Sequence, residues 1–124
     1  MATITPVALP VDDWIAQSGT TIYQWPSVAP GDQCLPIDVA VHSFISVQVS
    51  GVLDGGSVAI DGTLSEKSPY APLHDDHGND IAIASYPMGY DSVIESVKDA
   101  ARKLKPSLHG GGASLVTITI LVRK

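Results

Sequence analysis

The residues with the clearest chemical potential form one short stretch, His74-Asp75-Asp76-His77-Gly78-Asn79-Asp80. Imidazole nitrogens and carboxylate oxygens are the ligands that zinc and calcium take in proteins. The order does not fit a calcium loop, because the alternating oxygen ligands and the final glutamate are missing. Asp, Gly and Asn are also the residues that a tight turn needs for its backbone. We therefore expect a solvated turn and no metal site, with a metal-dependent enzyme built on His74 and His77 as a competing hypothesis.

Other patterns that carry catalysis are missing as well. No serine lies in a Gly-x-Ser-x-Gly elbow. Glu66 and Glu95 are the only glutamates, and no spacing brings two carboxylates into a cleft. Gly110-Gly111-Gly112 follows no strand and starts no helix, so it is not a phosphate cradle but a flexible connection that permits close backbone approach. We predict no enzyme, no catalytic residue and no cofactor.

Composition restricts the partners that the chain can have. Its 124 residues include 7 basic and 13 acidic ones, for a formal net charge of −6. An acidic chain without a basic cluster cannot neutralise phosphates, so nucleic acid is excluded as a partner. No apolar run approaches the roughly 20 residues of a membrane span, and the N-terminus does not resemble a signal peptide. Cys34 is the single cysteine, so it forms no intrachain disulfide and is expected to be a small apolar filler.

Alternation of apolar and polar residues predicts strands from Val39 onward. In Ser43–Ser50, for example, the residues Ile45, Val47 and Val49 share one face. Asp54-Gly55-Gly56 predicts a turn that joins this strand to the next one in a hairpin. The remaining predicted strands are 57–63, 70–74, a strand beginning at 81, and 114–122.

The segment 92–104 has a different pattern. Val93, Val97, Ala101 and Leu104 recur at helical spacing, and Ser92-Val93-Ile94-Glu95 matches a capping box. Pro106 would end a helix. We therefore predict one short helix near residues 92–100.

Five of the nine prolines lie within the first 36 residues. Because proline removes a backbone donor, we expect no regular central strand there but an extended arm over 1–36, followed by a β domain over 37–124. The predicted fold is mainly β, an antiparallel, jelly-roll-like β-sandwich. The candidate contacts to a partner lie on the arm and on the last strand, which we expect to be an edge: Trp14, Tyr23, Trp25, Leu115, Thr117, Thr119 and Leu121.

From residue 46 to the C-terminus the chain resembles the capsid decoration, or cement, proteins of tailed bacteriophages. The order of several elements carries the resemblance. They are Val47-Gln48-Val49-Ser50-Gly51, the stretch 56–64, Tyr70-Ala71-Pro72-Leu73-His74-Asp75 followed by Gly78-Asn79, Lys103-Leu104-Lys105-Pro106, and Gly110-Gly111-Gly112 before a Thr/Val/Ile strand ending in Arg123-Lys124.

The resemblance implies a virion structural protein on the capsid exterior, made in the cytoplasm of the bacterial host. It also implies the major capsid protein as partner and a homo-oligomer, either a dimer or a trimer. Two alternatives stay open. One is a carbohydrate-binding β-sandwich module, and the other is a different virion component such as a head–tail or tail protein.

Overall fold

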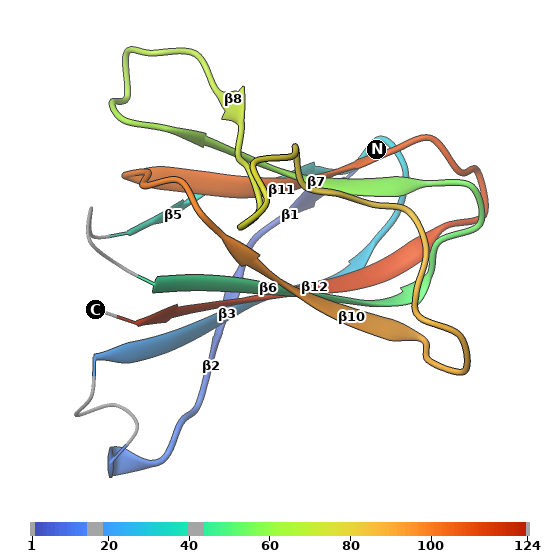
Figure 1. Cartoon of the computed structure of the whole chain (residues 1–124), viewed down its shortest axis with the longest axis horizontal. Helices are drawn as coiled ribbons and strands as arrows, with labels where there is room; N and C mark the ends of the chain where they lie inside the picture. Colours follow the sequence, from blue (N-terminus) through green and yellow to red (C-terminus); the bar gives the residue numbers. More distant parts are fainter. Residues whose placement is uncertain (1, 15–18, 40–43, 124) are drawn as a thin grey trace.

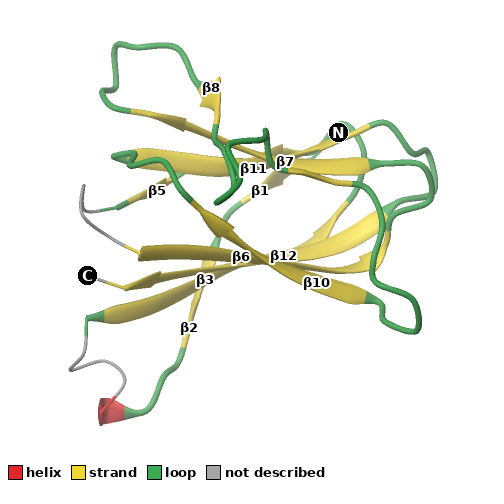
Figure 2. Cartoon of the chain, viewed as in Figure 1, coloured by secondary structure: helices red, strands yellow, loops and turns green. Residues whose placement is uncertain are grey.

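The alternation of apolar and polar residues produces two antiparallel β-sheets that face each other across an apolar core (Figure 1). These are the main features of a computed structural model that describes residues 2–14, 19–39 and 44–123. The mainly β, antiparallel sandwich predicted from the sequence is confirmed, and Figure 2 shows strands in both layers.

The first sheet contains the longest strands. Its order is β10 (Ser92–Val97), β6 (Phe44–Val52), β12 (Leu115–Arg123), β3 (Thr20–Val28) and β2 (Val7–Leu9). The second sheet has the order β5 (Ile37–Asp38), β11 (Lys103–His109), β7 (Ser57–Thr63) and β8 (Ala71–Pro72), and β9 (Ala82–Ile83) also pairs with β7. A short parallel pair, β1 (Thr3–Ile4) with β4 (Gln33–Cys34), completes the described strands.

The core lies between the sheets and follows the predicted alternation. On β12, Val116, Ile118, Ile120 and Val122 are buried, and the residues between them face outward. The inward residues of β6 and β7 are likewise buried aliphatics. Burying a branched aliphatic side chain stabilises the fold by about 1.5–3 kcal/mol, so these alternating strands supply much of the driving force for folding.

The predicted hairpin between residues 43 and 63 is wrong in its pairing, although the turn is present. Residues 54 and 55 form the turn, but β6 belongs to the first sheet and β7 to the second. The turn therefore carries the chain from one layer to the other. Turn chemistry does not distinguish these outcomes, because the choice of neighbour depends on strands that come later in the chain. Residue 43 itself lies outside the described residues.

The predicted helix near residues 92–100 is also wrong. This segment forms β10, whose Val93, Glu95 and Val97 pair with inward-facing residues of β6. A spacing of four residues satisfies a strand of period two as well as a helix of period 3.6, so Val93 and Val97 did not discriminate between them. The β-branched Val93, Ile94 and Val97 favour the strand once β6 offers a partner.

The expectation that no regular strand forms before residue 36 is wrong. Within the described part of the segment 1–36, β3 is a nine-residue strand that lies between β12 and β2. Pro26 is accommodated by a register shift opposite Val116 and Ile118, and Ser27 adopts a positive φ of 54° at that place. A bulge is where a sheet tolerates proline, since the missing donor is not needed for the ladder.

The glycine run 110–112 brings two chain segments into close contact, as expected. Gly111 has a φ of 67° and lies against the backbone of Gly56, where a Cβ atom would collide with it. A side chain at either position would separate the 53–56 turn from the start of β12. In the described part of the chain, no helix is long and apolar enough to cross a membrane.

Candidate functional site

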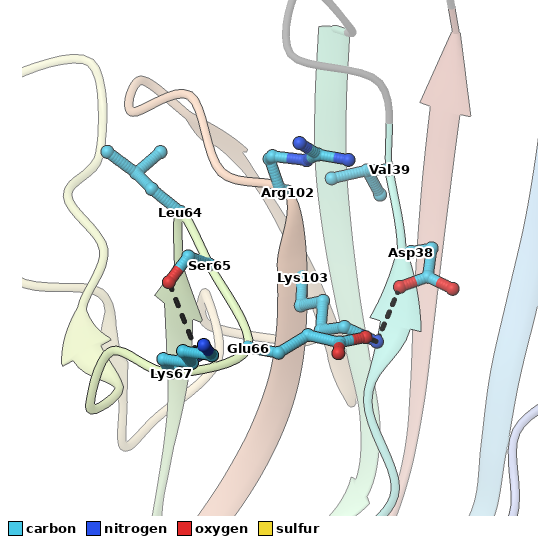
Figure 3. A pocket seen from close by; sticks show the side chains of 8 residues that line it. All are labelled: Asp38, Val39, Leu64, Ser65, Glu66, Lys67, Arg102 and Lys103. Carbon is cyan, nitrogen blue, oxygen red and sulfur yellow. Dashed lines mark hydrogen bonds and ion pairs between the residues drawn. The ribbon is translucent and has the colours of Figure 1, made fainter.

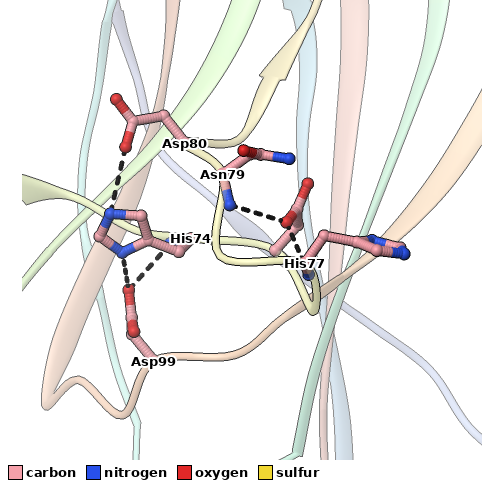
Figure 4. Close-up of polar contacts among 6 residues, drawn as sticks. His74, His77, Asn79, Asp80 and Asp99 are labelled. Carbon is pink, nitrogen blue, oxygen red and sulfur yellow. Dashed lines mark hydrogen bonds and ion pairs between the residues drawn. The ribbon is translucent and has the colours of Figure 1, made fainter.

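The histidine stretch singled out in the sequence forms an ion-pair cluster with a residue from a distant loop (Figure 4). His74 Nδ1 lies 2.6 Å from Asp99 Oδ2, and His74 Nε2 lies 3.1 Å from Asp80 Oδ1. The backbone N–H of His74 donates to the same Asp99 oxygen at 2.9 Å, and the N–H of Lys98 donates to the His74 carbonyl at 2.8 Å. We call His74, Asp80 and Asp99 the His74 clamp. It ties the loop after β8 to the connection between β10 and β11.

The clamp favours the charged forms of its members. The hydrogen bond to Asp99 is the main reason that the pKa of His74 is raised, and the negative charges of Asp99 and Asp80 act in the same direction. Partial burial would raise the pKa of Asp99, but the hydrogen bonds from the ring and backbone of His74 lower it overall. With both ring nitrogens facing carboxylates, His74 acts as a double donor and is poorly placed to be a metal ligand or a general base.

The predicted turn within this stretch is confirmed. Asp75 Oδ1 accepts the backbone N–H groups of His77 at 2.9 Å and Asn79 at 3.1 Å, and Gly78 has a φ of 83°. Figure 4 shows the His77 ring pointing away from His74, so the two imidazoles do not converge. Over the described ranges, no group of three His, Cys, Asp or Glu side chains is arranged to hold a metal ion.

A second polar cluster lies on the outer surface of the second sheet and was not recognised in the sequence. Ser107 Oγ lies 2.9 Å from His109 Nε2 and donates to Asp61 Oδ2 at 3.3 Å. A nucleophilic triad needs the histidine between the serine and the acid, whereas here the serine is in the middle. The sequence signal for this cluster is the i, i+2 spacing of Ser107 and His109, because residues two positions apart lie on the same face of a strand but not of a helix.

The candidate contacts on the N-terminal segment have three different environments. Trp25 is fully buried, and its Nε1–H donates to the carbonyl of Leu35 at 2.9 Å. It is therefore a core residue, and its assignment as a partner contact is corrected. Tyr23 is half-buried and packs against the core, while Trp14 is 71% exposed. The sequence does not show which of these aromatics is buried. Burial of Trp25 depends on β3, and the prolines of this segment argue against a strand.

The candidate contacts on β12 share one surface, but that surface is not an edge. Leu115, Thr117, Thr119 and Leu121 all face outward, and β12 lies between β6 and β3. The expectation of an edge strand is therefore wrong. Among the described strands, the edges of this sheet are β10 and β2, because β10 pairs only with β6 and β2 only with β3.

The outward residues of β10, β6, β12 and β3 form a surface that we call the neutral face. Its residues are the outward residues of β12 and those that the strand register aligns with them on the other three strands. They are Ser92, Ile94, Ser96, Phe44, Ser46, Gln48, Ser50, Val52, Leu115, Thr117, Thr119, Leu121, Arg123, Thr20, Ile22 and Gln24. A shallow groove of about 240 Å³ runs across it, lined by Ile22, Ile94 and Leu121 together with residues of β6 and Thr119. Ile94 is 65% exposed and Leu121 is 36% exposed.

Cys34 is not placed for chemistry. Burial is the main reason that its thiol pKa is raised to about 11, and the charge of Asp32 adds to the effect. A thiol that stays protonated at neutral pH is a poor nucleophile. Cys34 therefore contributes to the core, where it is buried with Ile37 and the neighbouring strands.

No protein-family model matches the chain, and no curated protein matches it. A solved structure that it resembles is the cupin_2 domain of an XRE-family transcriptional regulator from Enterobacter cloacae. The sequence identity is 11%, the alignment covers 96% of each chain, and the TM-score is 0.42.

This finding corrects the resemblance to bacteriophage capsid decoration proteins. The solved structure is a domain of a transcriptional regulator and not a decoration protein, and nothing supports a capsid decoration role. The motifs that suggested it are strand and turn segments, which many unrelated β proteins share because the physical requirements are the same. The major capsid protein as partner and the virion exterior as location were implications of that resemblance and have no other support.

Proposed function

We propose that this chain is a non-catalytic β-sandwich domain that associates with a second copy of itself through the neutral face. The observation behind the proposal is that an acidic chain has one large sheet surface without acidic residues. The chain carries 13 Asp and Glu residues, yet none is among the outward residues of β10, β6, β12 and β3.

Charge favours this surface over the others. Two copies with a net charge of −6 repel each other, and the repulsion is smallest where no carboxylates meet. Glu95 lies on β10 but pairs with Val47 on the inward side, so it does not contribute to the neutral face. Arg123 is the single charged residue among the outward positions of the four strands, and it lies over the ring of Phe44 with its Cζ 5.4 Å from the centroid.

The apolar groove gives the association a driving force. The exposed Ile94 and Leu121 and the half-buried Ile22 line one groove across four strands, because the register places their side chains on the same side of the sheet. Burying aliphatic surface stabilises a contact by about 25 cal/mol per Å². A two-fold arrangement would bring the same groove together from both copies, with serine, threonine and glutamine around it to form hydrogen bonds.

The absence of catalysis is part of the same proposal. Its support is twofold: Asp61 contacts Ser107, whereas in a triad it would orient the His109 ring, and both ring nitrogens of His74 face carboxylates. Hydrolytic activity abolished by Ser107→Ala would overturn this part.

Sedimentation velocity over a wide concentration range tests the association. We expect the unchanged chain to show a dimer, and Leu121→Glu to shift it to the monomer because a carboxylate is then buried in the groove. The matched control is Met88→Glu, which adds the same charge at a loop residue that is 98% exposed and is not one of the residues of the neutral face. A monomeric parent chain, or equal dissociation in both variants, would contradict the proposal.

A further inference from the structure

A polar pocket of about 610 Å³ is lined by residues of the second sheet and its adjoining loops (Figure 3). Its walls come from three segments that are distant in the sequence, namely 38–39, 64–67 and 102–103. Three of the seven Lys and Arg residues of the chain line it, which are Lys67, Arg102 and Lys103. On a chain with a net charge of −6, this is a local concentration of positive charge.

One of the three cations is already compensated. Lys103 Nζ lies 2.8 Å from Asp38 Oδ1 and 3.4 Å from Glu66 Oε1, and Figure 3 shows the ammonium group between the two carboxylates. The hydrogen bond with Asp38 is the main reason that the pKa of Lys103 is raised. The ion pairs connect β5, β11 and the loop after β7, so they hold the walls of the pocket together.

The other two cations have no side-chain partner in the described part of the chain. The backbone of Arg102 is nevertheless held on both sides, since its N–H donates to the Thr63 carbonyl at 2.9 Å and its carbonyl accepts the Val39 N–H at 2.8 Å. The N–H of Lys67 donates to Ser65 Oγ at 3.2 Å. These backbone contacts fix where the two side chains start, while the guanidinium and ammonium groups stay available for a ligand.

We propose that this pocket binds a small organic oxyanion, with Arg102 and Lys67 as its direct partners. The planar guanidinium group suits the paired oxygens of a carboxylate or phosphate, and an ammonium group adds a second charge. Leu64 and Val39 provide an apolar wall for the rest of the ligand. The three cations exceed the two carboxylates of the pocket by one charge, so a single anionic group balances the site.

A titration followed by amide NMR, with inorganic phosphate in one arm and malonate in the other at constant ionic strength, tests the proposal. We expect saturable shifts at residues 67, 102 and 103 in at least one arm, and the arm that saturates identifies the oxyanion. Arg102→Gln should weaken that binding about tenfold, since it removes a charge-assisted hydrogen bond. Lys98→Gln removes a cation outside the pocket and should leave the affinity unchanged.

Asp38→Asn tests the proposal through a gain in anion affinity, where Arg102→Gln tests it through a loss. It removes one carboxylate and releases Lys103, so the anion should bind more tightly than to the unchanged chain. Loss of structure cannot explain a gain in affinity. Shifts that do not saturate in either arm, or an equal loss in Arg102→Gln and Lys98→Gln, would overturn the proposal.

Discussion

The two outer surfaces of the sandwich differ in charge although both are built from alternating strands. Outward positions on the first sheet carry serine, threonine, glutamine and exposed aliphatics, with Arg123 as their one charge across the four described strands β10, β6, β12 and β3. Outward positions on the second sheet carry Lys103, Lys105, Asp61 and His109, and they bind one another or neighbouring loops.

The difference shows how one architecture separates two kinds of contact. A neutral surface with an apolar groove can be covered by another protein surface at little electrostatic cost. A surface of compensated charges keeps its side chains in water and suits small charged ligands better than a broad interface. Among the described strands, the nine-residue ones belong to the first sheet, whereas the second combines the seven-residue β7 and β11 with the two-residue β5, β8 and β9.

The largest effect should come from the buried anchor of the first sheet. Trp25→Ala is expected to reduce the free energy of unfolding by about 3–5 kcal/mol, because it leaves a cavity and removes the hydrogen bond to Leu35. Denaturation in urea measures the change. Trp14→Ala is the matched control, since that side chain is exposed, and its effect should stay within about 0.5 kcal/mol. Equal effects would mean that β3 is not an integral strand of the first sheet.

A smaller effect should come from the His74 clamp on the second sheet, and it should depend on pH. Because the folded-state pKa of His74 is raised above its ordinary value of 6.5, the clamp stabilises fully below that pH and is lost as pH rises through the folded-state value. The lowered pKa of Asp99 means that its contribution is present above about 3.8 and is lost as pH falls further. The clamp therefore stabilises the fold most strongly between mildly acidic and near-neutral pH.

Thermal melting across that window tests the clamp. Asp99→Asn should remove most of the decline in melting temperature that the parent chain shows as the pH rises, and the His74 ring should titrate at a lower pH by NMR. The control is Asp76→Asn, which alters a carboxylate of the same loop that is outside the clamp. A decline that persists unchanged in Asp99→Asn would show that another group is responsible.

The smallest expected effect is a difference in strength between two cation–π contacts, one on each outer surface. Lys105 Nζ lies 4.5 Å from the centroid of the Tyr70 ring, whereas Arg123 Cζ lies 5.4 Å from that of Phe44. A double-mutant cycle with Lys105→Gln and Tyr70→Leu should give a coupling of about 0.5 kcal/mol, as expected for an exposed pair. The corresponding cycle with Arg123→Gln and Phe44→Leu should give less. The reverse order would show that the longer contact on the neutral face is the stronger one.

Local patterns in the sequence determined β6, β7 and β12, the faces of these strands and the turn at residues 75–79. Ile45, Val47 and Val49, or Ile118 and Ile120, are buried as their alternation requires, because a pleated strand directs successive side chains to opposite sides. Asp75 and Gly78 form their turn from contacts within five residues. Such features depend on neighbours along the chain, so they can be predicted from it.

Tertiary structure alone decided which strands are neighbours and which polar groups meet. The 92–97 segment became β10 because β6 offered it a ladder, and β3 tolerated Pro26 because a register shift absorbed it. His74 and Asp99 are 25 residues apart, and Lys103 reaches Asp38 from a different strand. No local spacing encodes these pairs, since they depend on which strands and loops become neighbours in the fold. For the same reason His74, in the stretch that the sequence singled out, forms an ion-pair clamp with Asp80 and the distant Asp99.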